Sequence, residues 1–250
     1  MKREFYREYN EVEDVHWWFV ARRNILLEIL KRYVGESADG TRRILDVGCG
    51  TGTMLTYLAR FGSAEGVDID TEAIEYCRAR GLKQVSQSAA DSLPFANDTF
   101  DLVTALDVVE HIDDDLGVLR EVRRVLRPGG QLLLTVPAYR FLWGRQDEIN
   151  LHKRRYVARE VRERLQASGY EVQRLSYMNA LLFPAIAAIR LVRHVLPAPV
   201  ELESDFAFPA PRPLNGLLSK VFGTERYMLN RFNLPFGVSI MALARKPDEH

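Results

Sequence analysis

The stretch ILDVGCGTGT, residues 44–53, decides the fold class of this 250-residue chain. An apolar strand runs directly into three glycines at alternate positions, Gly48, Gly50 and Gly52, and a helical segment follows. A strand, a glycine-rich turn and a helix are how nucleotide-binding α/β folds hold an adenosine-containing ligand. The stretch therefore predicts an α/β fold, with NAD, FAD, ATP and S-adenosylmethionine (SAM) as candidate ligands.

Strands and helices alternate on both sides of this stretch. Short apolar runs predict strands, and the segments with helical spacing between them predict helices. Runs that are almost wholly apolar are typical of parallel strands buried on both faces, so the order predicts a doubly wound, Rossmann-like fold. The predicted strands are residues 43–47, 64–69, a weak one near 85, 100–106 and 131–137. The predicted helices are residues 17–34, 51–61, 71–81 and 114–127.

The last third of the chain has a different pattern. Residues 156–168 predict a helix, 170–178 an alternating strand and 237–245 a final strand. Between those two strands lies a long insertion, with an apolar segment (181–196), the proline-rich FPAPRP (208–213) and a second helical stretch.

This pattern predicts three parts of the chain. An N-terminal helical cap (1–39) precedes a core made of residues 40–178 and 236–246, and a helical lid (179–235) is inserted between the last two strands.

The composition is that of an ordinary globular protein, with 47% hydrophobic residues, 27% charged residues and a formal net charge of +0. The neutral charge gives no electrostatic reason to expect nucleic acid as a partner. The charged start of the chain lacks the apolar core of a secretory signal. Of the two cysteines, Cys49 lies in the glycine loop and Cys77 on a predicted helix, which does not favour a disulfide framework, so we predict a cytoplasmic protein.

The spacing of the glycines narrows the choice of ligand. A dinucleotide-binding loop has glycines at its first, third and sixth positions, whereas the sixth position here is Thr53. A phosphate-binding Walker loop ends in Gly-Lys-Ser/Thr, and GCGTGT has no lysine. With Asp46 two positions before the first glycine, the stretch resembles the first motif of class I SAM-dependent methyltransferases.

Three further segments carry the same resemblance in the order that the family has them. GVDID places Asp68 at 20 residues after the first glycine, the separation expected for a carboxylate that binds ribose hydroxyls. Asp70 is better placed to cap the following helix. SAADSLPFANDTFDLV (88–103) resembles the segment whose aspartate, here Asp91, binds the adenine amino group, and LRPGGQLLLTVP (126–137) resembles the turn into the fifth strand.

The resemblance, in particular to the UbiE-like small-molecule branch, covers about residues 40–140 and implies both a fold and a site. The implied fold is a seven-stranded sheet whose last strand is antiparallel and lies beside the fifth. In related enzymes an N-terminal helix also closes over SAM, where an arginine is placed to pair with the methionine carboxylate. The implied cofactor-binding residues are Asp46, Gly48, Cys49, Gly50, Gly52, Asp68, Ile69, Asp91, Ser92, Leu106, Trp17 and Arg22.

The segments that leave the carboxyl ends of the strands are candidate walls of the site, because ligands of open α/β sheets bind there. In LDVVEHIDDD (106–115), His111 follows the fourth strand within reach of the methyl group, either as an orienting histidine or as a general base. The aspartates at 113–115 are typical of a helix cap and first turn. We therefore expect no metal ion in the site.

The segment YRFLWGRQDEINLHKRRYV (139–157) is too long and too rich in polar and aromatic residues for a plain connector. It resembles a W…D…H.RRY segment found in a subgroup of these enzymes. Asp147 and His152 are candidates for a base and its orienting carboxylate, since histidine titrates near neutrality; the alternative for the arginines is a solvated helix start. The predicted acceptor-binding residues are His16, Trp143, Arg155, Tyr156 and Tyr177.

The insertion 179–235 joins two strand ends on the cofactor side, so we expect it to cover the site. Its apolar segment (181–196) is either a packed cap helix, or a channel or in-plane membrane contact for a lipid-linked acceptor. EDVHWWFVARRN (13–24) is expected to close over the cofactor together with it, the alternative being core tryptophans and solvated arginines.

The sequence thus predicts a SAM-dependent methyltransferase that acts on an oxygen or nitrogen atom of a small-molecule or lipid-linked acceptor. One alternative is a non-catalytic SAM-binding module whose lid serves a partner protein. The other is an NAD-dependent oxidoreductase, which Thr53 disfavours. Nucleic acid is not an expected substrate, because LDVV follows the fourth strand where Asn-Pro-Pro-Tyr would be needed.

Overall fold

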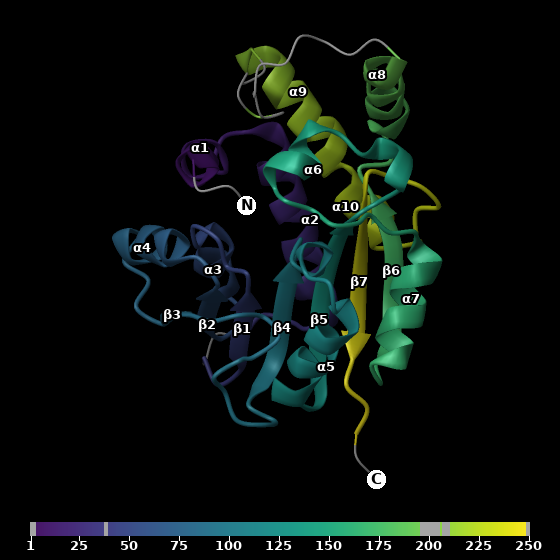
Figure 1. Cartoon of the computed structure of the whole chain (residues 1–250). Helices are drawn as coiled ribbons and strands as arrows, with labels where there is room; N and C mark the ends of the chain where they lie inside the picture. The colour runs from purple at the N-terminus through teal and green to yellow at the C-terminus, as the bar shows by residue number, and fades with distance from the viewer. Residues whose placement is uncertain (1–3, 38–39, 196–205, 207–210, 249–250) are drawn as a thin grey trace.

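A computed structural model describes residues 4–37, 40–195, 206 and 211–248, and its centre is a seven-stranded sheet (Figure 1). The strand order is β3-β2-β1-β4-β5-β7-β6, in which β7 is antiparallel to both of its neighbours and the pairs on the other side are parallel. This order confirms the predicted fold class, including the antiparallel last strand beside the fifth. The strands are β1 Arg43–Val47, β2 Ser63–Asp68, β3 Val85–Gln87, β4 Phe100–Leu106, β5 Leu126–Pro137, β6 Glu171–Met178 and β7 Ser239–Arg245.

Helices cover both faces of the sheet and gather at one of its ends (Figure 1). The α-helices are α1 Glu4–Val12, α2 Trp17–Tyr33, α3 Thr53–Leu58, α4 Thr71–Ala79, α5 Asp115–Val125, α6 Arg145–Ile149, α7 Ala158–Ala167, α8 Phe183–Val195, α9 Arg212–Gly223 and α10 Glu225–Leu229. Two short 3-10 helices are η1 Val109–His111 and η2 Arg140–Leu142.

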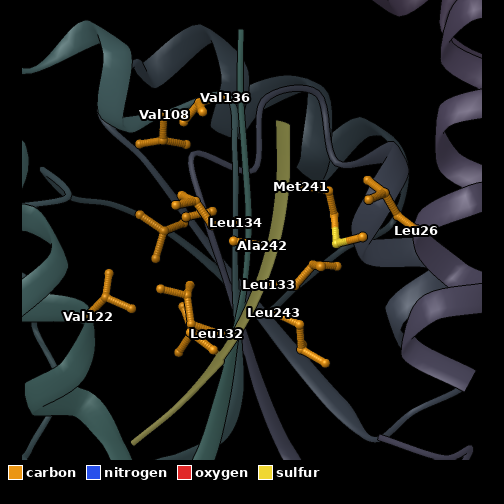
Figure 2. Close-up of a cluster of buried hydrophobic side chains, with 14 of the residues drawn as sticks. Leu26, Val108, Val122, Leu132, Leu133, Leu134, Val136, Met241, Ala242 and Leu243 are labelled. Atoms are coloured by element: carbon orange, nitrogen blue, oxygen red, sulfur yellow. The ribbon is translucent and has the colours of Figure 1, made fainter. Parts of the chain in front are cut away.

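The middle of the sheet is apolar on both faces. Figure 2 shows Leu132 and Leu134 of β5 on the side of Val122 from α5, and Leu133 on the side of Leu26 from α2. All five side chains are buried. Because successive side chains of a strand point to opposite faces, a continuous apolar run is what this doubly covered strand requires.

Helix α2 has two roles along its length. Ile25, Leu26, Ile29 and Leu30 are buried in the core of the sheet domain, while the first turns of the helix border the cavity described below. The helix ends where predicted, and Gly35 follows with a left-handed φ of 76°. The second half of the expected N-terminal cap is therefore a layer of the core.

Two element boundaries differ from the prediction. Helix α3 begins at Thr53 rather than at residue 51, because Gly52 precedes it in the left-handed region with a φ of 87°. Strand β5 begins at Leu126 rather than at residue 131, because Leu126 already pairs with Phe100 and a register shift follows before regular pairing resumes.

Helices α1, α6, α8 and α9 lie beyond the carboxyl ends of the parallel strands (Figure 1). We call these four helices the roof. The Trp17 backbone N–H donates to Asn215 Oδ1 (2.8 Å), and Asn215 Nδ2 donates to the Val15 carbonyl (2.9 Å), which ties α9 to the start of α2. Gln146 Nε2 donates to Tyr9 Oη (2.9 Å), which ties α6 to α1. The proline-rich piece lies outside the described residues up to position 210.

Candidate active site

The glycine loop leaves the carboxyl end of β1 and requires glycine for steric reasons. Gly48, Gly50 and Gly52 have φ values of 69°, 54° and 87°, a region that residues with a Cβ rarely adopt. A Cβ on Gly48 would lie 2.5 Å from Val108 Cγ2, whereas a Cβ on Gly50 would meet open space. The backbone at Gly50 is therefore free for close approach by a ligand.

Asp68 stands at the end of β2 with its carboxylate against the glycine loop. Its oxygens accept hydrogen bonds from the backbone N–H groups of Gly50 (2.9 Å) and Asp70 (3.0 Å). Burial raises the pKa of this carboxyl above its ordinary value. Asp70 caps α4 by accepting from the Glu72 N–H (2.9 Å), which confirms its predicted capping role.

Asp46 lies beneath the loop, inside the sheet. Its Oδ1 accepts a hydrogen bond from the Thr104 hydroxyl (2.5 Å), and both side chains are buried. Burial raises the pKa of Asp46 to about 7. Asp46 therefore supports the loop from below while also reaching the cavity wall.

One cavity of about 910 Å³ brings most of the predicted cofactor residues together. Gly52 and Ser92 are outside its wall, since Gly52 faces Cys77 and Leu82 and Ser92 is exposed in a turn. The predicted cofactor residues that line it are Asp46, Gly48, Cys49, Gly50, Asp68, Ile69, Asp91, Leu106, Trp17 and Arg22.

The segment between α1 and α2 closes over the glycine loop through Glu13, a residue that the sequence analysis did not select. The Glu13 carboxylate accepts from the hydroxyls of Thr51 and Thr53, and it forms an ion pair with Arg80 (2.7 Å). Glu13 also lines the cavity. No local pattern identifies it, because its partners are far away in the sequence.

Arg22 is placed on the cavity wall, but its guanidinium is engaged by the protein. It pairs with Asp107 Oδ2 (2.7 Å) and donates to Thr135 Oγ1 (2.6 Å), which in turn donates to Asp107 Oδ1 (3.0 Å). Asp107 adopts a left-handed φ of 60° directly after β4 and lines the cavity as well. To bind a ligand carboxylate, Arg22 must therefore either contact Asp107 and the ligand at the same time or exchange Asp107 for the ligand.

His152 and Asp147 form the hydrogen-bonded pair that the sequence analysis proposed. His152 Nδ1 lies 2.8 Å from Asp147 Oδ1, and Arg155 holds the same carboxylate through Nε (2.8 Å) and Nη2 (3.0 Å). Burial alone would raise the pKa of Asp147, but the hydrogen bonds from His152 and Arg155 lower it to about 2. The carboxylate is thus charged, and it fixes the orientation of the imidazole.

His111 and Glu110 complete this wall. The rings of His111 and His152 are 4.7 Å apart between centroids, and both histidines line the cavity. Burial is the main cause that lowers the pKa of His111 to about 4, and the nearby His152 is the second cause. Glu110 is fully buried, and burial together with the Asp107 charge raises its pKa well above the ordinary range. Glu110 was missed, although it adjoins His111 at the end of a strand.

The structure places some of the predicted acceptor-binding residues on the cavity wall and the others away from it. His16 and Arg155 line the cavity, whereas Trp143, Tyr156 and Tyr177 do not. Tyr156 is buried and donates to Asp115 Oδ2 (2.9 Å), and Tyr177 stacks on Tyr139 with its hydroxyl accepting from the Ala158 N–H (3.0 Å).

Asn179, at the end of β6, is a cavity residue that was not predicted. It is 1% exposed, adopts a left-handed φ of 59°, and its side-chain amide has no hydrogen-bond partner among the described residues. Buried polar groups are normally paired, so this amide is available to a ligand.

The aspartates at 113–115 have structural partners, as predicted. Asp114 caps α5 by accepting from the Gly117 N–H (2.8 Å), and Asp113 pairs with Lys153. Asp115 is buried and pairs with Arg154 (3.2 Å) and Arg164 (2.6 Å).

The cysteines and the lengths of the helices bear on the class of protein. Cys49 and Cys77 are both buried free thiols. Within the described ranges, every helix is too short or too polar to cross a bilayer.

Comparisons with known proteins agree with this geometry. Residues 45–134 match the family described as "Methyltransferase domain". The methyltransferase GfsG of Streptomyces halstedii is 41% identical over 101 residues, which cover 37% of this chain and 36% of that protein. The ubiquinone biosynthesis O-methyltransferase of Xanthomonas oryzae is 36% identical over 100 residues, which cover 37% of this chain and 42% of that protein. The chain thus spans only about two fifths of the length of these curated relatives.

A solved structure resembles the whole chain. A chain of the complex between the Haloferax volcanii Trm112 methyltransferase activator and a methyltransferase superposes with a TM-score of 0.63 at 20% identity, covering 99% of this chain and 96% of that one. A likeness at this identity shows the fold alone. With the family match over the glycine loop, residues 45–134 are similar to a methyltransferase domain, which implies S-adenosyl-L-methionine as the cofactor, and the sheet around them has the fold of that solved structure.

Proposed function

We propose that the protein transfers the methyl group of SAM to an oxygen or nitrogen atom of a small, largely apolar acceptor. The observation that carries this proposal is that a single cavity is lined by the glycine loop and Asp68 and also by His111 and His152. A cofactor wall and a wall of titratable groups therefore share one space, as a transfer reaction requires.

The residues of the first wall fit the cofactor. Asp68 accepts two backbone hydrogen bonds, and a carboxylate has about four lone-pair sites, so capacity remains for ribose hydroxyls. The open space at Gly50 admits a ligand close to the backbone, and Ile69 and Asp91 lie on the wall where the adenine is expected. These positions support the cofactor roles that the resemblance implies.

Bound SAM supplies a methyl group that is already activated on a sulfonium. The chain has to align the acceptor, exclude water and assist the loss of the acceptor proton. As the new bond to oxygen or nitrogen forms, the sulfur–methyl bond breaks and one proton leaves the acceptor. His152 Nε2 has no hydrogen-bond partner among the described residues, and Asp147 orients the ring from the other nitrogen. This pair is placed to assist that proton loss.

The rest of the cavity supports an acceptor with an apolar body. Trp18 and Phe19 of α2 and Ile186 and Ile189 of α8 line it together with Arg190. The relative named as a ubiquinone biosynthesis O-methyltransferase supports an oxygen acceptor and a lipid-linked one. We therefore favour an apolar or lipid-linked acceptor that offers a hydroxyl group.

Calorimetry with SAM and a transfer assay test the proposal. We expect SAM to bind, NADH not to bind, and methyl transfer to occur within a panel of phenols, amines and lipid-linked phenols. Binding of SAM without transfer to any member would favour the alternative of a SAM-binding module whose lid serves a partner protein. Absence of SAM binding would contradict the proposal as a whole.

A further inference from the structure

Glu110, His111 and His152 form a compact cluster of metal-ligand types beside the cavity. One ligand atom from each residue lies within 4.8 Å of the others. Glu110 and His111 belong to η1, directly beyond β4, and His152 follows α6, so the cluster joins two segments that leave neighbouring strands. We call these three residues the Glu-His-His cluster.

Three polar atoms of this cluster are buried without hydrogen-bond partners among the described residues. They are both carboxylate oxygens of Glu110 and the Nε2 atom of His152. The nearest approach between them is 3.8 Å, too long for a hydrogen bond. Buried acidic groups are normally hydrogen-bonded, paired with a charge or bound to a metal ion, so a bound group is expected to satisfy Glu110.

The surroundings of His152 are those of a metal ligand. Asp147 Oδ1 lies 2.8 Å from Nδ1, and because a carboxylate only accepts, Nδ1 carries a proton and donates the hydrogen bond, which directs Nε2 toward Glu110 and His111. A metal-binding histidine almost always donates its other ring N–H to a carboxylate or carbonyl in this way. Arg155 holds Asp147 with two hydrogen bonds, which makes the arrangement rigid.

We propose that Glu110, His111 and His152 bind a divalent cation at the wall of the cofactor cavity. Two imidazole nitrogens and one carboxylate suit Zn²⁺, Mn²⁺ and Fe²⁺ and leave coordination positions open. Because His111 and His152 line the cavity, the open positions face the space where the acceptor is expected. The expectation of no metal rested on the aspartates at 113–115, which the structure pairs with Lys153, Arg154 and Arg164 or uses as a cap.

The cation changes the part that His152 plays. As a ligand through Nε2, His152 would not accept the acceptor proton, and the bound cation would polarise the acceptor oxygen and so ease the loss of its proton to water. This second statement rests on the proposed function and selects an oxygen acceptor. The binding of the cation itself does not depend on it.

The test is calorimetric titration of untagged, chelator-treated full-length protein with Zn²⁺ and with Mn²⁺. We expect one ion per chain and a higher Tm in its presence, because a ligand that binds the native state stabilises it. Glu110→Gln should abolish saturable binding, and Asp147→Asn, which keeps all three ligands, should weaken it by about 10–100-fold. Glu148→Gln removes an exposed carboxylate from the same helix as Asp147 and should bind as wild type does.

Several outcomes would overturn the inference. If no ion binds at a fixed stoichiometry, water and not a cation fills the cluster. If wild type, Glu110→Gln and Asp147→Asn bind the ion equally, the ion lies elsewhere. Because Glu110→Gln can fail to fold, circular dichroism accompanies each titration, and Asp147→Asn keeps the test decisive in that case. Titration of the same samples with SAM separates the two proposals. SAM binding without cation binding contradicts only the cluster, and cation binding without SAM binding contradicts only the proposed function.

Discussion

Asp68 and Asp46 both stand beside the glycine loop, but their surroundings give them different tasks. Asp46 is directed into the sheet, where the Thr104 hydroxyl binds it, and its carboxyl is buried enough for a pKa of about 7. Asp68 is held by two backbone N–H groups at the cavity wall and retains acceptor capacity toward a ligand. At the scale of single residues, the direction of a carboxylate decides whether it supports the loop or binds the cofactor.

Asp68→Ala should remove most of the SAM affinity while the fold stays intact. Two hydrogen bonds to a charged acceptor would be lost, at roughly 1.5–3 kcal/mol each, which is on the order of 100-fold or more in Kd. Isothermal calorimetry measures the loss. Asp70→Asn is the matched control, because it removes the neighbouring charge and keeps the helix cap. Wild-type affinity in folded Asp68→Ala protein would contradict the assignment.

His152→Ala should lower turnover by roughly 100-fold or more while SAM binding holds, since the acceptor side of the cavity loses its oriented imidazole. Asp147→Asn should give a smaller loss, because the ring remains and only its orientation suffers. Steady-state kinetics with the pH profile of kcat/KM provide the measurement. Retained turnover with a normal profile in His152→Ala would move the role to His111 or to alignment alone.

His16 should make the protein less stable in mild acid. Its Nδ1 accepts the Trp18 N–H (3.3 Å) as the cap of α2, and burial lowers its pKa from 6.5 to about 4. Between these values the unfolded chain binds more protons than the folded one, so stability falls as the pH drops from about 6.5 and levels off below about 4. His16→Asn keeps a cap that does not titrate. Thermal melts from pH 7 to 4 should show a shallower loss of Tm in this variant, and parallel curves would exclude His16 as a contributor.

At the scale of elements, hydrogen bonds join the helices that form the roof of the cavity. Asn215 of α9 holds both the Trp17 N–H and the Val15 carbonyl at the start of α2, and Gln146 of α6 holds Tyr9 of α1. The lower part of α2 is fixed differently, by apolar burial against the sheet. We expect the upper elements to open at a lower cost than the strands at the centre of the sheet, most of whose side chains are buried.

Asn215→Ala should loosen the start of α2 without unfolding the core. Two hydrogen bonds disappear, at about 0.5–1.5 kcal/mol each, so hydrogen exchange of residues 15–19 should become faster by roughly 10-fold while β4 and β5 stay protected. Hydrogen-exchange mass spectrometry follows both regions at once. Lys220→Ala, an exposed position on the same helix, serves as the control. Unchanged exchange at residues 15–19 would show that packing alone holds the α2 start.

At the scale of the whole molecule, parts from both ends of the chain enclose the cavity. Residues of α1 and α2 form one side of its wall and residues of α8 another, and the sheet edge supplies the floor. We propose that the N-terminal segment and the insertion 179–235 act as a lid over the core. Leu191 and Val192 of α8 are more than half exposed, at 52% and 57%, and neither lines the cavity, so part of this lid presents apolar side chains outward.

The lid should close further when the cofactor binds. Ligand binding shifts such an equilibrium only by its differential affinity for the closed state, so protection should follow occupancy. Hydrogen exchange of residues 5–23 and of the insertion 179–235 should slow with SAM or its demethylated product, compared with the protein alone. Protection confined to residues 44–107 would contradict a lid. The apolar face of α8 would then be better assigned to a partner or a membrane surface, and liposome flotation would decide between these.

Most of the fold and the cofactor side of the site could be predicted from the sequence. The sequence contains three signals that predict them. These are the apolar runs of β4 and β5, the glycines at 48, 50 and 52, and Asp68 at its fixed separation from the loop. Each of these signals is local, because it depends on the backbone conformation or burial of a few consecutive residues. The pair of Asp147 and His152 could also be predicted from the sequence, since only 5 positions separate its members.

The residues that were missed take their roles from partners far away along the chain. Glu13 meets Thr51 across 38 positions, and Glu110 faces His152 only because β4 and β5 are neighbours in the sheet. Likewise, Arg22 was expected to meet a ligand, but the fold brings it to Asp107. A sequence pattern determines which residues enter a strand, a turn or a buried face, because those preferences are short-ranged. Which charges end up paired, and which are left unpaired at the cavity, depends on the tertiary packing that brings distant strand ends together.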